Sequence, residues 1–496
     1  MKGEKRLSRR TLLRGLAGVA GAGVVSTTLS GCASGNTAAI SSAASSTYRS
    51  LSNFRPPPIV IGVRPSGTAP GVVLVDCHGG AGQQGPMIIG ANGELVWFKP
   101  VSDNGTPVLR AMNLRVQRYQ GKPVLTWFEG QVVSGHGQGH YIIADTSYRQ
   151  IATVQAAHGM TGDLHEFFLT DTGTAIFSVY GTATGNLTSV GGAHAGPYYF
   201  GEVQEIDVAS GKLLFSWRTD QHVSFNESHE ALPANPAQPW DYFHLNSIAI
   251  DPSDGNLVIS SRDTWAIYKV HRTSGAIMWR LGGKKSDFTM GPGTNFAFQH
   301  HVTPYAGGLY TIFDNEGSPF VKPPSRGLIL KVDEVARTAT FVRQFLHSPP
   351  VMSGADGSVS ILPNGNFFVG WGTSTYFSEY DPSGKLIFDG HLSGAKIISY
   401  RAFKQPWTAQ PSSPPAITVE RTPSTTLVFA SWNGATEVAS WRVLAGGATD
   451  SLKVVGTAPK SGFETRIVIK SRPKRVAVEA LDSTAKVLRR SAVKYL

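Results

Sequence analysis

The sequence predicts an all-β protein in which a β-propeller is followed by a small β-sandwich. Short strand-like runs that end in Gly, Asn or Asp turns fill the middle of the chain, with few stretches of helical periodicity. A strand–turn–strand unit recurs within that region. After a proline-rich boundary at residues 405–415, a second set of short alternating strands begins.

The recurring unit is a strand, a tight turn and a second strand that carries an aromatic residue. It occurs four times, at residues 90–97, 207–217, 271–279 and 381–388. Repetition of this kind is typical of propeller blades. The region 57–410 is long enough for six or seven blades at about 40 to 50 residues each. A large array of sandwiches is the structural alternative.

The last segment, residues 416–496, is predicted to be the sandwich. Candidate strands lie at 426–432, 440–444 and 475–480. Short alternating strands over about 80 residues resemble a fibronectin type III or immunoglobulin-like module. We find no catalytic constellation in this segment, so its predicted role is packing or attachment.

Residues 1–31 are predicted to be an export signal and not part of the fold. Six basic residues flank and enter the apolar run 15–30. Residues 8–13 (Ser-Arg-Arg-Thr-Leu-Leu) resemble the twin-arginine motif of proteins that are exported already folded. The sequence therefore predicts a bacterial export substrate.

The export signal ends in Leu-Ser-Gly-Cys, which resembles a lipobox and predicts that Cys32 is lipidated as the first mature residue. An uncleaved anchor or a chance match is the alternative. Residues 32–56 are mostly Ser, Ala, Thr and Gly at their start and are predicted to be a flexible tether. The folded part would then be held at the outer face of the cytoplasmic membrane.

Net charge is unevenly distributed along the chain. The formal charge is +11, and residues 1–31 hold six basic and one acidic residue, which leaves +6 after processing. Residues 416–496 hold thirteen basic and six acidic residues. A basic tail on a tethered protein favours contact with anionic lipid or cell-wall polymer over nucleic acid. A solvated charged surface explains the same composition.

Only one cysteine besides Cys32 is present, so no intramolecular disulfide is expected. Cys77 ends the strand-like run 72–77 and is predicted to be a buried, unreactive side chain. All fourteen histidines lie between His78 and His391, outside the basic tail. Any chemistry is therefore predicted to belong to the middle of the chain.

A set of polar side chains lies at the edges of apolar strands in that middle region. Its members are His165, His244, Asn246, Arg262 and His300. Alternation along a strand predicts that His244 and Asn246 share one face. In a propeller the innermost strands converge on a central channel, so these distant residues can meet at one mouth. Each histidine alone is more often structural.

Residues 241–247, 261–269, 279–284 and 298–300 resemble the bacterial arylsulfotransferase-like family. This resemblance implies a six-bladed propeller that moves a sulfuryl group from a phenolic sulfate ester to another phenol. It implies no adenosine phosphosulfate donor and no cofactor. By match, His300 would be the nucleophile that forms a sulfohistidine, with His301 as the alternative. His165, His244, Asn246 and Arg262 would bind sulfate and manage protons.

This assignment is chemically reasonable because neutral imidazole is nucleophilic near pH 7, and covalent catalysis divides a difficult transfer into two steps. Arg262 and Asn246 would offer donors to an anionic group. The pair His136 and His140 lies in a glycine-rich stretch without nearby carboxylates or thiolates, so no metal site is predicted. A non-catalytic surface-binding propeller and a hydrolase using the same channel are the alternatives.

Overall fold

The computed structural model describes residues 47–80, 82–101, 108–317, 320–322 and 324–496. The predicted export signal, Cys32 and the first part of the predicted tether lie outside these residues. Within the described residues the regular structure is 35 β-strands and five short 3-10 helices. None of the helices in this part of the chain is long and apolar enough to cross a membrane. The protein is therefore all-β, as predicted.

Up to Gln405, the described chain forms six units of four antiparallel strands each. The first two are joined in one sheet and comprise β5 (Arg110–Tyr119), β6 (Lys122–Val133), β7 (His136–Ala144) and β8 (Gln150–Val154), then β9 (Gly162–Leu169), β10 (Thr174–Gly185), β11 (Gly196–Asp207) and β12 (Leu213–Arg218). The third comprises β14 (Leu245–Ile250), β15 (Leu257–Ser261), β16 (Ala266–Val270) and β17 (Ile277–Gly282).

The remaining three units complete the series. The fourth comprises β19 (His300–Tyr305), β20 (Leu309–Asp314), β21 (Arg326–Asp333) and β22 (Thr338–Phe345), and the fifth β23 (Ser358–Ile361), β24 (Phe367–Gly370), β25 (Tyr376–Tyr380) and β26 (Leu386–Leu392). The sixth comprises β27 (Ala402–Gln405), β2 (Val72–Cys77), β3 (Gly85–Ile89) and β4 (Leu95–Phe98). Three strands are added at edges: β1 (Ile59–Val63), β13 (Trp240–Asp241) and β18 (Thr289–Met290).

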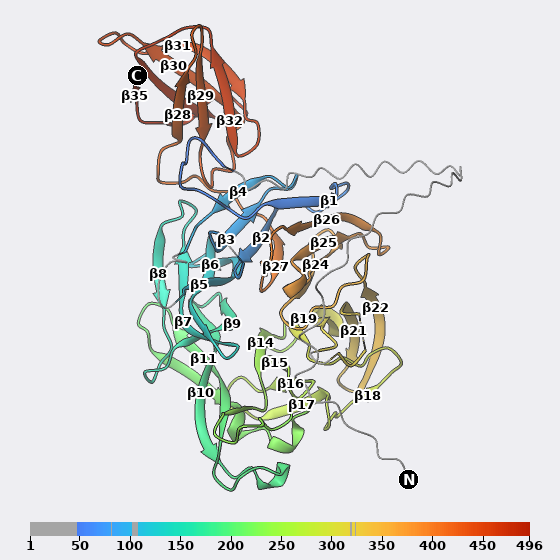
Figure 1. The fold of residues 1–496 in the computed structure, drawn as a ribbon. Coiled ribbons are helices and arrows are strands. Elements are labelled where there is room, and N and C mark those ends of the chain that lie inside the picture. Colours follow the sequence, from blue (N-terminus) through green and yellow to red (C-terminus); the bar gives the residue numbers. More distant parts are fainter. Residues whose placement is uncertain (1–46, 81, 102–107, 318–319, 323) are drawn as a thin grey trace, which may run out of the picture. The chain divides into compact units, whose positions relative to one another are not determined.

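The first strand of each unit contacts the first strand of the next, in the order β5, β9, β14, β19, β23 and β27, and β27 contacts β5 again. We call these six the inner strands. Two pairings between distant parts of the chain close the ring: β27 pairs with β2 and β1 pairs with β26, as Figure 1 shows. The early strand β1 joins the sheet of β23–β26, and the late strand β27 joins the sheet of β2–β4. Backbone hydrogen bonds between the two ends of this region therefore close the ring.

The four predicted strand–turn–strand units are the third and fourth strands of their sheets. Their aromatic residues Trp97, Trp217, Trp279 and Phe388 are all at most 4 % exposed. The indole of Trp217 donates to the carbonyl oxygen of Gly275 at 2.9 Å, which connects the second unit to a turn of the third. Burial of these large rings contributes much of the apolar stabilisation between units.

Residues 416–496 form two further sheets around their own core. One contains β28 (Ala416–Arg421), β29 (Thr426–Ser431) and β32 (Glu464–Ile469), and the other β30 (Ser440–Gly446), β31 (Lys453–Pro459), β33 (Arg475–Leu481), β34 (Val487–Arg490) and β35 (Lys494–Tyr495). Both sheets contribute to one cluster that includes Trp441, Val428 and Val478. The three predicted strands correspond to β29, β30 and β33.

The end of the predicted tether is packed. Phe54 is 8 % exposed and its ring stacks on Phe463 with centroids 5.4 Å apart. The backbone N–H of Ser50 donates to Glu464 Oε2 at 2.6 Å. Aromatic side chains supply the apolar surface that the preceding Ser/Ala-rich stretch lacks. The predicted tether therefore extends too far toward the C-terminus.

Cys77 is buried at the end of β2, as the sequence predicts. Burial raises the pKa of its thiol well above the usual range, and the charge of Asp76 raises it further. A thiol with a raised pKa is a poor nucleophile. Cys77 is a packing residue.

Candidate active site

A cavity of about 440 Å³ lies near the starts of the inner strands; we call it the histidine cavity. Its polar residues are His78, Arg110, His165, His244, Arg262, His300 and Asp356. Four of the five predicted site residues therefore line one cavity, although they are up to 135 positions apart in the chain. Asn246 does not.

Asn246 differs from the prediction because the chain is not extended at His244. His244 has a φ of 51°, a left-handed conformation that breaks the expected alternation before β14 begins. Asn246 is fully buried below the cavity, and its Nδ2 donates to the carbonyl oxygen of Gln299 at 2.6 Å. Its Oδ1 has no hydrogen-bond partner among the described residues.

His300 is the first residue of β19 and is 1 % exposed. Its Nδ1 lies 2.8 Å from Asn315 Oδ1 and 3.1 Å from the carbonyl oxygen of Phe298. The Asn315 amide is oriented by its own donation to two backbone carbonyls at 2.9 and 3.0 Å. Both neighbours of Nδ1 are acceptors, so the ring proton is on Nδ1 and Nε2 keeps its lone pair.

Burial lowers the pKa of His300 well below its ordinary value. The positive charge of Arg262 lowers it further, while the hydrogen bond with Asn315 raises it in part. The imidazole is therefore neutral at pH 7. A neutral ring with a free Nε2 lone pair is the form that attacks an electrophile.

His165 and His244 form a pair backed by two aspartates. Their Nε2 atoms are 3.1 Å apart, His165 Nδ1 lies 2.7 Å from Asp163 Oδ2, and His244 Nδ1 lies 2.5 Å from Asp241 Oδ2. Because each Nδ1 faces a carboxylate, the contact between the two Nε2 atoms requires one shared proton. The pair thus holds a single transferable proton inside the cavity.

The pKa shifts of His244 and Asp163 indicate which ring of the pair is the acceptor. Burial lowers the pKa of His244 to about 4, although Asp241 opposes the shift. Burial alone would raise the pKa of Asp163, but the charge and hydrogen bond of His165 outweigh it and lower the pKa to about 2. Asp163 is therefore a carboxylate at pH 7, and the neutral His244 ring is the acceptor of the pair.

His136 adds a third imidazole, because its Nε2 lies 2.8 Å from the same Asp241 oxygen that contacts His244. The ligand atoms of His136, Asp241 and His244 lie within 4.8 Å of one another, so this group is the candidate metal site. Its contacts of 2.5 and 2.8 Å are hydrogen-bond lengths, shorter than the separation of about 3.3 Å expected between tetrahedral zinc ligands. Shared protons account for this geometry without a metal, and His140 is not part of the group.

Arg262 follows β15 and presents its guanidinium to the cavity. Nη1 donates to Asp263 Oδ1 at 2.6 Å, and the guanidinium carbon lies 4.7 Å from the centre of the Phe298 ring. Burial raises the pKa of Asp263, and the charge of Arg262 offsets this only in part. The positive charge is therefore incompletely neutralised, and Arg262 keeps donors for an anion.

Several polar groups of the site were missed in the sequence. Asp163 precedes His165 by two residues, and Asp76 precedes His78 by two, with a contact of 3.1 Å between the side chains of that second pair. Residues i and i+2 of a strand share a face, so an Asp-x-His pattern was a usable signal. Asp356, in the loop before β23, had no such signal. Burial and the charge of Asp76 together raise its pKa to about 8, although the charges of Arg401 and Arg262 lower it in part.

A buried polar layer lies next to the histidine cavity. The Arg401 side chain is fully buried, and its Nη1 contacts Glu166 Oε2 at 3.0 Å. The hydroxyl of Tyr400 donates to the carbonyl oxygen of His165 at 3.1 Å. His301 belongs to the opposite side of this layer and does not line the histidine cavity. Adjacent residues of a strand point in opposite directions, and here His300 is the one that reaches this cavity.

The Arylsulfotransferase (ASST) family model matches residues 115–393, more than half of the chain. The chain belongs to the arylsulfotransferase family. All five residues predicted by the resemblance lie within the matched segment. No curated protein matches this family member in sequence.

Several solved structures are similar in fold. A Bacteroides caccae protein of unknown function has a TM-score of 0.41 and 12% identity, covering 67% of this chain and 98% of its own. A Dyadobacter fermentans protein of unknown function has a TM-score of 0.37 and 8% identity, covering 73% and 95%. The Dos1 propeller has a TM-score of 0.29 and 9% identity, covering 76% and 87%. Of these three, the Dos1 structure is the one described as a propeller.

Proposed function

We propose that this family member is an aryl-sulfate sulfotransferase that uses His300 as its nucleophile. The protonation state of His300 carries this proposal. Its ring is neutral and its proton is on Nδ1, which faces Asn315 Oδ1. Nε2 therefore keeps a free lone pair in the cavity that Arg262 also lines. The reaction would need no adenosine phosphosulfate. The donor would be a phenolic sulfate ester and the acceptor a phenol.

In the first half-reaction, His300 Nε2 attacks the sulfur of the aryl sulfate. An N–S bond forms and the S–O bond to the aryl group breaks. Arg262 donates to the sulfuryl oxygens as their charge is redistributed. The departing phenolate takes the proton that His165 and His244 share, and leaves as a phenol.

In the second half-reaction, an acceptor phenol gives its hydroxyl proton back to the His165–His244 pair. Its oxygen attacks the sulfur, and the N–S bond to His300 breaks. The aspartates hold the two imidazoles in orientation throughout. Asp356, with a pKa of about 8, is neutral at pH 7 and adds no negative charge to the cavity.

In this proposal the six antiparallel units are the blades of a six-bladed propeller, and residues 416–496 are a fibronectin type III-like or immunoglobulin-like module. The protein is exported and anchored to the outer face of the cytoplasmic membrane through Cys32. The basic C-terminal module contacts lipid or cell-wall polymer. Labelling with radioactive palmitate, compared between the natural chain and Cys32→Ala, tests the anchor: equal labelling would contradict it.

The activity is tested with the purified full chain and 4-nitrophenyl sulfate, with and without phenol. We expect 4-nitrophenol release that depends on phenol, together with equimolar phenyl sulfate. Release without phenol would identify a hydrolase. A folded protein that releases nothing would favour a non-catalytic binding propeller for this donor.

The intermediate is tested with sulfur-labelled donor in the absence of acceptor. We expect acid-labile label on the natural protein and none on His300→Ala. The His301→Ala variant is the matched control and should be labelled like the natural protein. Label retained on His300→Ala would place the nucleophile elsewhere.

A further inference from the structure

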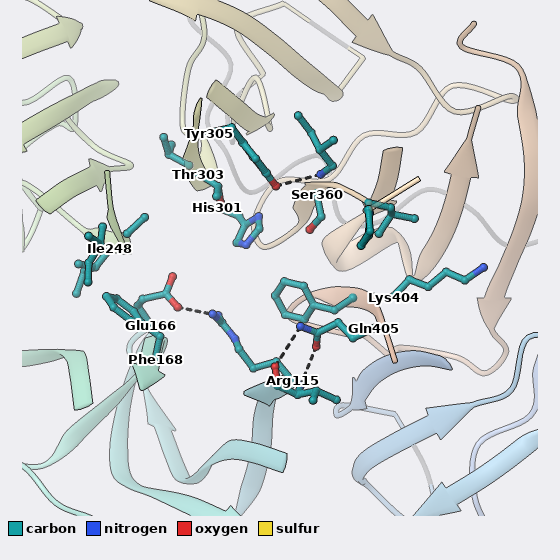
Figure 2. Close-up of a pocket in the computed structure, with 18 of the residues that line it drawn as sticks. Arg115, Glu166, Phe168, Ile248, His301, Thr303, Tyr305, Ser360, Lys404 and Gln405 are labelled. Atoms are coloured by element: carbon teal, nitrogen blue, oxygen red, sulfur yellow. Dashed lines mark hydrogen bonds and ion pairs between the residues drawn. The ribbon is translucent and has the colours of Figure 1, made fainter. Parts of the chain in front are cut away.

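A second cavity, of about 580 Å³, lies on the other side of the buried layer; we call it the distal cavity. Figure 2 shows this cavity and its labelled residues. All six inner strands line it, through residues further along each strand than those of the histidine cavity. None of the residues assigned to sulfuryl transfer lines it. It is therefore a separate site.

The walls of the distal cavity are mostly apolar. They include Phe168, Phe403, Leu362 and Pro363, and the β14 residues Ile248 and Ile250. Two aromatic rings and several branched side chains favour a flat or branched carbon skeleton. A cavity of this size accommodates a bicyclic aromatic molecule.

Two cationic side chains line this cavity, Arg115 and Lys404, and Lys404 has its own partner in Glu379 Oε2 at 2.6 Å. Figure 2 shows Arg115 reaching toward Glu166. Its Nη2 lies 2.7 Å from Glu166 Oε1, and its guanidinium lies over the Phe403 ring at 4.9 Å. The same carboxylate also pairs with Arg401 at 3.0 Å. Two guanidinium groups thus share one carboxylate, which leaves a net positive charge beside the cavity.

This excess charge affects Arg115 directly. Burial lowers its pKa, Glu166 opposes that shift, and the charge of Arg401 lowers it further. Its Nε is buried and has no partner among the described residues. A buried donor without a partner costs free energy that an acceptor would recover. The guanidinium therefore favours an anionic acceptor in the cavity.

His301 adds a second donor. Its Nδ1 accepts the backbone N–H of Val359 at 3.3 Å, so the proton of the neutral ring is on Nε2. Burial lowers the pKa of His301 well below its ordinary value, and the charges of Arg401 and Arg115 lower it further. Figure 2 shows the imidazole of His301 reaching into the cavity. It offers an N–H and no lone pair.

We propose that the distal cavity binds an aromatic organic anion, with its ring against Phe168 and Phe403 and its anionic group between Arg115 and His301. The anionic group is a carboxylate or a sulfate ester, since both present planar or tripodal oxygens to these donors. Binding at this site does not require the sulfuryl transfer proposed for the histidine cavity.

The experiment is isothermal titration of the full chain with 2-naphthoate, and separately with 2-naphthyl sulfate using the His300→Ala variant to prevent turnover. Naphthalene-2-carboxamide is the neutral isostere. We expect 2-naphthoate to bind at least tenfold more tightly than the amide. In Arg115→Met this preference should disappear while amide binding persists, which also shows that the cavity is intact. The ratio of the two anion affinities identifies the preferred anionic group.

Two further variants locate the site. Thr303→Trp keeps Arg115 and fills the cavity, so it should weaken both the acid and the amide by tenfold or more. His300→Ala should leave 2-naphthoate binding unchanged. The proposal is overturned if the natural chain binds 2-naphthoate no better than the amide, if Arg115→Met keeps the preference, or if His300→Ala abolishes binding while Thr303→Trp does not.

Discussion

The two cavities lie within the same ring of six inner strands but differ in the groups that hydrogen-bond to their imidazoles. In the histidine cavity, each key Nδ1 faces an oxygen acceptor: Asn315 for His300, Asp163 for His165 and Asp241 for His244. In the distal cavity, Nδ1 of His301 accepts a backbone N–H. Two adjacent histidines therefore carry their proton on different nitrogens.

This difference gives the two residues different chemistry. His300 presents a lone pair to its cavity and can form a covalent bond to sulfur. His301 presents an N–H and can only donate to a ligand. The buried layer of Arg401, Tyr400 and Glu166 keeps the two environments apart. The hydrogen-bond partner of Nδ1 therefore determines which of the two histidines can act as a nucleophile.

The largest expected effect distinguishes the two adjacent histidines. His300→Ala should reduce sulfuryl transfer by at least about 10³-fold, because the nucleophile is lost. His301→Ala should change the rate by less than about fivefold. Initial rates with 4-nitrophenyl sulfate and phenol measure both, with thermal unfolding as the control for folding. Equal losses of transfer rate in the two variants would contradict the assignment of different chemistry to His300 and His301.

The second-largest expected effect tests the hydrogen bonds between Asp241 and the histidines of the histidine cavity. Asp241→Asn should lower kcat by about 10 to 100-fold, because the amide no longer stabilises the orientation and proton of His244 and His136. The matched control is Asp389→Asn, which alters an Asp–His contact of 3.3 Å with His347 outside both cavities. If the control loses as much activity as Asp241→Asn, the aspartate effect is structural and general.

A smaller effect concerns pH. Asp356 has a pKa of about 8, so it is protonated at pH 7 and gains a negative charge as pH rises through 8. That charge repels the aryl sulfate, and kcat/KM should fall by about fivefold between pH 7 and 9. Asp356→Asn cannot ionise and should lack this fall. Comparing the two proteins at each pH removes the contribution of phenol ionisation, and identical profiles would contradict the prediction.

The smallest expected effect is that of metal removal. Incubation with EDTA should leave the transfer rate within about twofold, because protons already account for the contacts among His136, Asp241 and His244. Metal content by mass spectrometry, measured before and after EDTA, is the control. Loss of activity together with loss of bound zinc would show that the histidine cavity is a metal centre.

The sequence anticipated the all-β class and the buried aromatic residues of the repeated turns, because alternation and turn residues are local signals. Through the resemblance to the family it also predicted that His165, His244, Arg262 and His300 lie together, and all four line the histidine cavity. Its local rules failed at Asn246, where the positive φ of His244 interrupts the alternation. They also failed at residues 47–56, where aromatic residues dock on a distant part of the chain.

By itself, the sequence determined which residue types were available and on which strands they lay. Only the tertiary structure decided that Asp241 contacts both His136 and His244, that Arg115 and Arg401 share Glu166, and that His300 and His301 carry opposite tautomers. Most of these properties depend on partners 15 to 235 residues away, such as Asn315 for His300 and Arg401 for Glu166. A proton is placed by its nearest acceptor in space, and closure of the ring of inner strands determines which acceptor that is.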